Sequence, residues 1–113
     1  QTPQNTTLEF KIVQDADRLD AMGAIGIART FNYGGHKNRE LYNPHFPPQE
    51  YANAQEYRNS QSPTLNHFYE KLLKLKDAMN TPTAKKIAEH RHAFMETYIQ
   101  EFMNEWNIEN LNQ

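Results

Sequence analysis

Three aspartates stand close together in a segment that is otherwise apolar. Asp15, Asp17 and Asp20 fall between Ile12 and Ala21. On a helix, Asp17 and Asp20 share one face because they are three residues apart, whereas Asp15 points away from Asp17. Aspartate is a poor residue for a helix interior, and hard divalent cations bind carboxylate oxygens. The cluster is therefore a candidate source of one metal ligand, and the alternative is a helix that turns a charged side to water.

The histidines offer a second type of ligand, but their spacing argues against a local metal site. The five are His36, His45, His67, His90 and His92. His90 and His92 are two residues apart, so on a helix they point to different sides and do not chelate one ion together. We interpret the histidines as satisfied or solvated side chains. The chain has no cysteine, which excludes disulfides, thiolate zinc sites and cysteine nucleophiles.

Two further sets of side chains suit a phosphorylated ligand. The first set is basic and consists of Lys71, Lys74 and Arg91. These side chains would either line a phosphate pocket or lie on solvated helix faces. The second would stack on a base or pack a long loop onto the helices; it consists of Tyr33, Tyr42, Tyr51 and Tyr57.

The elements that position these residues are expected to be helices. Thr6 and Glu9 have the spacing of a capping box, which predicts a helical block over residues 6–31 that weakens at Gly23 and Gly26. Gly34-Gly35 should end this block. Residues 1–5 are polar and expected to fray.

The rest of the chain predicts a long loop followed by a helix pair. Residues 32–62 are rich in Asn, Tyr, Pro and Gln, so we expect a loop with a short helix within 49–59. Ser62-Pro63 and Thr81-Pro82 each read as an N-cap followed by a first helical residue. They predict antiparallel helices over 63–79 and 82–107 with a turn near Asn80. Each helix should carry a stripe of side chains at spacings of three and four: Leu65, Phe68, Leu72, Leu75 and Met79 on the first, and Ile87, Arg91, Phe94, Tyr98, Phe102 and Trp106 on the second. The predicted fold class is all-α.

Composition limits the function further. The chain has 113 residues, which suits one domain, and 12 Lys+Arg against 14 Asp+Glu give a net charge of −2. This balance gives no basis for general attraction to nucleic acid or to a membrane surface. No apolar run approaches the roughly 18 residues of a membrane span. The absence of cysteine fits a reducing cytoplasm, so we expect a cytoplasmic protein.

Two long blocks of the sequence resemble a known family. Residues 11–31, followed by Tyr33-Gly34-Gly35, and then 67–81 and 91–95, look like the C-terminal half of the HD-domain metal-dependent phosphohydrolases, closest to a small bacterial group. The resemblance covers about residues 8–106. It implies a helical bundle whose divalent ion is held by a His, an adjacent His-Asp pair and a final Asp.

The resemblance assigns roles to several residues. The final metal ligand matches Asp17, within Ala16-Asp17-Arg18-Leu19. Asp15 and Asp20 are then expected to orient the ligands as second-shell groups. Arg18 matches a position that contacts substrate phosphate, and Lys71 and Arg91 are added to it as candidates. The implied reaction is hydrolysis of a phosphoanhydride or phosphoester bond in a nucleotide, with Mn²⁺, Mg²⁺, Ni²⁺ or Fe²⁺ as the cofactor.

The sequence also departs from the family pattern. It contains no His-Asp dipeptide, and none of its histidines precedes Asp17. The chain therefore looks like the C-terminal part of a single HD domain, active only together with an N-terminal half. We expect an apolar surface around residues 24–31 to pair with that half or with a second copy. The alternatives are a non-catalytic helical module that binds a nucleotide or a protein, and a purely structural fragment.

Overall fold

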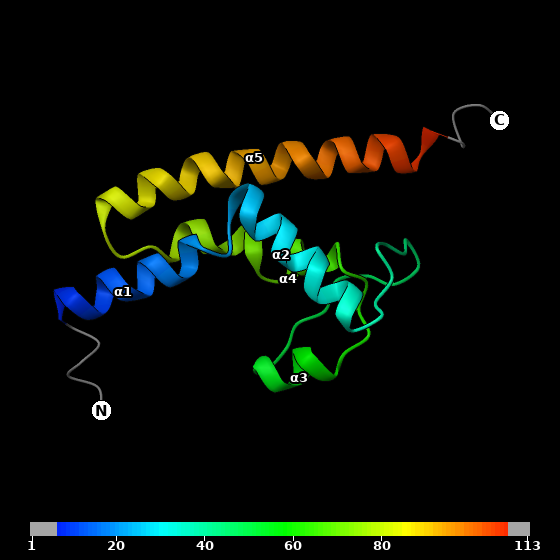
Figure 1. Ribbon diagram of the computed structural model, residues 1–113, viewed down its shortest axis with the longest axis horizontal. Coiled ribbons are helices and arrows are strands. Elements are labelled where there is room, and N and C mark those ends of the chain that lie inside the picture. The colour runs from blue at the N-terminus through cyan, green and yellow to red at the C-terminus, as the bar shows by residue number, and fades with distance from the viewer. Residues whose placement is uncertain (1–6, 109–113) are drawn as a thin grey trace.

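The computed structural model describes residues 7–108, and this part of the chain is all-α, as predicted. The helices are α1 (Leu8–Leu19), α2 (Gly23–His36), α3 (Ala54–Asn59), α4 (Asn66–Glu70) and α5 (Pro82–Trp106), with a 3₁₀ helix, η2, at Leu72–Ala78. The long α5 runs along one side, and α1, α2 and the α4–η2 segment lie against it (Figure 1). No helix among the described residues combines the length and apolar character that crossing a membrane requires.

The core lies between α5 and the elements it covers. Its buried members come from α2, α4, η2 and α5 and from the residues that precede α2 and α4, with Leu65 and Phe68 at 0% exposure. The predicted stripe on residues 63–79 is buried along its whole length; it consists of Leu65, Phe68, Leu72, Leu75 and Met79. The stripe expected on α5 is shifted, because Ile87 and Phe94 are exposed while Ala84, Ala88, Met95 and Ile99 are buried. Small alanines let α5 approach its neighbours closely.

The N-terminal block forms two helices, not one. Thr7 is the N-cap of α1, and its hydroxyl accepts a hydrogen bond from the Phe10 N–H at 3.0 Å. The predicted cap was Thr6, one residue too early, and that residue lies outside the described part, as does the expectation for 1–5. The first helix ends at Leu19, and Gly23 begins α2. Gly23 has a φ of 76°, a conformation that non-glycine residues rarely adopt.

The end of α2 also differs from the prediction. The helix continues through Gly34-Gly35 to His36, and Asn38 takes the left-handed conformation with φ of 59°. Asparagine tolerates this region better than most residues. Gly34 is needed for another reason: a Cβ atom there would lie 2.1 Å from the Thr64 hydroxyl oxygen. The glycine lets the segment before α4 pack directly against α2.

The helix predicted over 63–79 is interrupted. Ser62 does not cap it; its hydroxyl donates to Glu70 Oε2 at 2.9 Å, and α4 begins only at Asn66. A break at Lys71 separates α4 from η2. The helix start predicted at Thr81-Pro82 is confirmed, because the Thr81 hydroxyl accepts a hydrogen bond from the Ala84 N–H and Pro82 is the first residue of α5. The loop helix predicted within 49–59 is also present, as α3.

The two adjacent glycines of α2 provide a matched test of this packing. Gly34→Ala should destabilise the chain because its methyl group meets Thr64, although alanine favours helices. Gly35→Ala should be neutral or stabilise the chain by about 0.5–1 kcal/mol, since no heavy atom lies within 4 Å of a Cβ there. Urea unfolding of both variants measures the difference. Equal stabilities would show that Thr64 does not pack against Gly34 in solution.

Candidate functional site

Asp15 is the most deeply engaged of the three aspartates. It is 3% exposed, and its carboxylate accepts hydrogen bonds from the backbone N–H groups of Asn80 and Thr81, at 2.7 and 2.9 Å. The Asn80 amide and the Thr81 hydroxyl also donate to it. Burial alone would raise the pKa of Asp15, but these hydrogen bonds outweigh it and hold the pKa below its ordinary value. The hydrogen-bonding partners of Asp15 within residues 7–108 thus lie immediately before α5.

Asp17 is exposed and lies where two cavities meet. The first, which we call the Asp17 cavity, has a volume of about 350 Å³ and includes Asp20, Arg29 and Lys71 in its wall. The second, which we call the basic cavity, has a volume of about 500 Å³. Its charged lining consists of Asp17, Arg18, Glu70, Lys71 and Lys74. No hydrogen bond or ion pair engages the Asp17 carboxylate within residues 7–108.

The structure brings some of the predicted phosphate-binding residues together and separates one. Arg18 and Lys71 line the basic cavity with Asp17, although one Arg18 nitrogen already donates to the Ala78 carbonyl. Arg91 lines a different cavity with Asp20, and donates to the Leu19 carbonyl at 2.8 Å, where it ties α5 to the end of α1. Roles in substrate binding for these three residues remain predictions.

The described residues do not form a complete metal site. No group of three or more His, Cys, Asp or Glu side chains among them is arranged to hold an ion. Asp17 nevertheless has the properties of one ligand: an oxygen donor suited to hard divalent cations, exposed on a cavity wall and not committed to a partner there. Asp20 is also exposed and shares the Asp17 cavity, whereas the Asp15 oxygens are occupied by Asn80 and Thr81.

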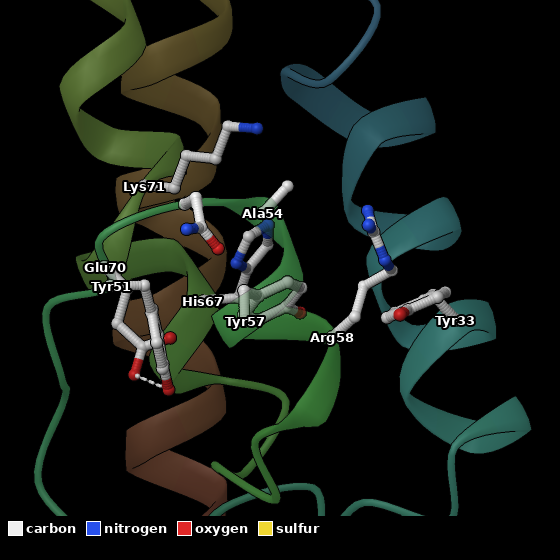
Figure 2. A pocket seen from close by; sticks show the side chains of 9 residues that line it. Tyr33, Tyr51, Ala54, Tyr57, Arg58, His67, Glu70 and Lys71 are labelled. Atoms are coloured by element: carbon white, nitrogen blue, oxygen red, sulfur yellow. Dashed lines mark hydrogen bonds between the residues drawn. The ribbon is translucent and has the colours of Figure 1, made fainter.

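A third cavity adjoins the other two. This aromatic cavity has a volume of about 560 Å³. Its ring-bearing residues come from α2, α3, α4 and the loop, and are Tyr33, Tyr51, Tyr57 and His67 (Figure 2). Tyr57 stacks on His67 with centroids 4.4 Å apart and on Tyr33 at 6.2 Å. Tyr42 lies elsewhere, packed on Phe102 and Trp106.

Arg39 fixes the wall of the aromatic cavity. It is 7% exposed and donates to the backbone carbonyls of Tyr57, Arg58 and Ser60, which lie at the end of α3 and just beyond it. Its guanidinium carbon lies 4.5 Å from the Tyr57 ring centroid and 5.2 Å from that of Tyr33. Carbonyl bonding and stacking on the two rings hold α3 beside α2. The tyrosines thus pack the loop and line a cavity at once.

Sequence reasoning missed three residues of this region. His67 was interpreted as satisfied or solvated, yet it lines both the aromatic and the Asp17 cavities, and its Nδ1 atom is buried with no partner among the described residues. Arg29 and Arg39 were not singled out at all. The only signal for His67 was its place in a segment that resembles the HD family. Arg39 gave no signal, because its partners are backbone carbonyls contributed by a distant part of the loop.

His67 should make stability depend on pH. Burial, together with the positive charges of Lys71 and Arg39, lowers its pKa from 6.5 to about 4. The unfolded chain therefore binds the proton more readily between these values, and stability should fall as the pH drops from about 6.5 to about 4. His67→Phe keeps a ring against Tyr57 but cannot titrate, so its unfolding free energy should fall less steeply in this range. Urea unfolding at a series of pH values measures the slopes, and identical slopes would contradict the assignment.

The chain is similar in sequence and in structure to known proteins. No protein-family model matches the chain. Over 95 residues it is 43% identical to the uncharacterized protein YpgQ of Bacillus subtilis (strain 168), a match that covers 84% of this chain and 38% of YpgQ. Among solved structures, an HD-superfamily hydrolase from Bacillus thuringiensis is 60% identical with a TM-score of 0.75, over 91% of this chain and 48% of that one.

A crystal structure of YpgQ in complex with ADP also matches, with 43% identity, a TM-score of 0.69 and coverage of 88% of this chain and 44% of that one. The chain thus spans less than half of the curated relative and about half of the solved structures. Over this span, it is similar in sequence and in all-α fold to an HD-superfamily hydrolase.

Proposed function

We propose that this chain supplies Asp17 to the divalent-metal site of an HD-type phosphohydrolase that cleaves a phosphoanhydride or phosphoester bond in a nucleotide. The observation that carries the proposal is the position of Asp17. Its carboxylate is exposed at the junction of two cavities lined by Arg18, Arg29 and Lys71, in a chain 60% identical to an HD-superfamily hydrolase. The remaining ligands, a His and a His-Asp pair, come from an N-terminal half of the same domain.

Different residues of this chain would bind the phosphate and orient the metal ligands at that site. A bound Mn²⁺, Mg²⁺, Ni²⁺ or Fe²⁺ ion would activate water and neutralise charge on a phosphoryl oxygen. Lys71 and Arg18 sit beside Asp17 and would bind the phosphate oxygens. Asp20, on the wall of the same cavity, would orient the ligands or their water. Arg91 would meet phosphate only if the ligand extended into its separate cavity.

A nucleotide is favoured as the substrate class by the complex of YpgQ with ADP, since YpgQ is 43% identical over most of this chain. Phosphate groups also suit the basic cavity. Its lining contains Arg18, Lys71 and Lys74 against Asp17 and Glu70, so one positive charge remains there to meet an anionic ligand.

The partner of this chain would cover its exposed apolar side chains. Leu8, Ile12 and Val13 on α1 are 52–67% exposed, and Ile25 on α2 is 72% exposed. Of the apolar surface expected around residues 24–31, Ile25 is exposed but Ile27 is buried in the core. Exposed large apolar side chains mark interaction surfaces. We assign this surface to the N-terminal half of the HD domain, with a second copy of the chain as the alternative.

The test is a hybrid protein, in which the part of the B. thuringiensis hydrolase that this chain does not match precedes residue 1. The hybrid should release phosphate or pyrophosphate from nucleotides when Mn²⁺ is added, and chelation should abolish the release. Residues 1–113 alone should show neither hydrolysis nor tight one-to-one Mn²⁺ binding by calorimetry. A folded hybrid that binds nucleotide but never hydrolyses it would favour the non-catalytic binding module.

A further inference from the structure

A row of aromatic side chains follows the C-terminal part of α5 and continues onto the loop beside it. Tyr98, Phe102 and Trp106 succeed one another at spacings of four residues, with ring centroids 6.3 and 5.8 Å apart. Tyr42 from the loop meets the outer two rings edge-on, at 6.2 Å from Phe102 and 5.3 Å from Trp106. Tyr98 and Phe102 pack against the core, whereas Trp106 is 43% exposed. The row therefore leads from the interior out to solvent.

The outer end of this row is apolar in the neighbouring residues as well. Ile108, just beyond Trp106, is 55% exposed, and Leu41, which precedes Tyr42, is 56% exposed. This surface lies at the opposite end of α5 from α1, whose exposed side chains we assign to the N-terminal half (Figure 1). Tryptophan and tyrosine rings that remain open to solvent are typical of protein interfaces.

Two glutamates flank the row and have no basic partner within residues 7–108. Glu101 and Glu105 are exposed and lie four residues apart on α5, and no Lys or Arg follows Arg91 in the sequence. Hydrogen bonding with Glu101 and the like charge of that side chain raise the pKa of Glu105. Burial and the charge of Glu105 raise the pKa of Tyr98, so the acidic pair lies beside the rings. We call this surface the α5 tip; it consists of Tyr42, Glu101, Phe102, Glu105 and Trp106.

The α5 tip is unfavourable for the isolated helix. Like charges four residues apart destabilise a helix, and acidic side chains are also unfavourable near a helix C-terminus, where the free carbonyls carry partial negative charge. The last turn of α5 contains no basic residue, and it is capped by the backbone N–H of Asn107. A segment that breaks several local rules without compensation is expected at a functional surface. A positive charge supplied by a partner would satisfy the two carboxylates and the helix end together.

We propose that the α5 tip binds a cationic segment of a partner protein, in which Lys or Arg side chains alternate with apolar ones. The basic side chains would pair with Glu101 and Glu105 and with the carbonyls that end α5. The apolar ones would lie on Tyr42 and Trp106, where a guanidinium group would also stack. Two copies of the chain joined tip to tip would bring four glutamates together, which opposes a symmetric self-contact. The α5 tip shares no residue with the cavities described above, so this binding is independent of the proposed hydrolysis.

The experiment uses the fluorescence of Trp106, the single tryptophan of the chain. The probe is a short helical peptide of Lys and Leu, and two counterparts carry Glu in place of Lys or Ala in place of Leu. The Lys–Leu peptide should saturate the 113-residue chain and shift the Trp106 emission to shorter wavelength. Each counterpart should bind about tenfold or more weakly, because it lacks either the charge or the apolar contacts.

Paired variants on α5 separate local contacts from net charge. Glu101→Gln with Glu105→Gln should weaken peptide binding about 3- to 10-fold and raise the thermal stability of the free chain, since their repulsion is removed. Glu89→Gln with Glu96→Gln is the matched control, because both residues are exposed and lie earlier on α5. The control changes the net charge equally and should bind the peptide as the wild type does. Trp106→Leu, followed by calorimetry, should also weaken binding.

Several results would overturn the proposal. Equal loss in the two glutamate pairs, or equal binding of the Ala counterpart, would reduce the effect to general attraction between charges. A wild-type chain that sediments as a dimer, and that Glu101→Gln with Glu105→Gln dissociates, would assign the α5 tip to a second copy. The hybrid protein should bind the peptide as the chain does, and failure to bind would assign the α5 tip to the N-terminal half. No metal or nucleotide is present, so none of these results bears on the proposed hydrolysis.

Discussion

Replacing Asp17 by alanine should lower metal-dependent hydrolysis by the hybrid about 100-fold or more, with helix content close to that of the wild type. The side chain is exposed and has no hydrogen-bonding partner within residues 7–108, so its removal leaves no buried polar group unpaired. The loss should therefore appear in catalysis and in Mn²⁺ affinity, with little change in stability. Turnover, calorimetry with Mn²⁺ and circular dichroism of the same preparation measure the three quantities.

Asp20→Ala is the matched control for this experiment. Asp20 lies on the same helix end, is exposed and lines the same cavity, but the HD resemblance gives it only a supporting role. Its removal should cost about 10- to 100-fold in metal affinity or activity, the range of groups that orient a ligand. Loss of Mn²⁺ binding in Asp15→Ala but not in Asp17→Ala would show that the metal-binding carboxylate was assigned to the wrong face of α1.

The sequence predicted the parts of this fold that depend on local pattern. The stripe from Leu65 to Met79 is buried as its spacing indicated, and Thr81-Pro82 opens α5. The same spacing rule did not show that Lys71 would break the helix into α4 and η2. Residues three apart, such as Leu72 and Leu75, lie near the same side of both an α-helix and a 3₁₀ helix, so their spacing does not distinguish the two.

The parts that were missed depend on contacts between distant segments. Gly34 looked like a helix terminator, but its role is set by Thr64, thirty residues away. The stripe on α5 was placed on large residues, whereas Ala84 and Ala88 face the core because the helix packs closely there. The wall of the aromatic cavity is held by Arg39, whose backbone carbonyl partners have no sequence signature. Candidate ligands could be named from the sequence, but the pocket beside them could not.

Asp15→Ala should have the largest effect on stability, because it removes the acceptor of four hydrogen bonds that join α1 to the start of α5. The N–H groups of Asn80 and Thr81 would lose their shared acceptor, and hydrogen bonds to a charged group contribute more than neutral ones. We expect a loss of about 3 kcal/mol in the free energy of unfolding, a large share of the 5–15 kcal/mol typical of a domain. Urea unfolding followed by circular dichroism measures it.

The Asp15 carboxylate should also make the free energy of unfolding depend on pH in the acid range. The pKa of Asp15 is lower in the folded chain than its ordinary value of 3.8, so its contribution is complete above pH 3.8 and is lost as the pH falls through the folded-state pKa. Asp15→Ala should flatten stability in that acid range, which lies below the range assigned to His67. The exposed control Asp17→Ala should stay within about 0.5 kcal/mol of the wild type. A variant of Asp15 as stable as that control would mean that the bonds to Asn80 and Thr81 are not what holds α1 against α5.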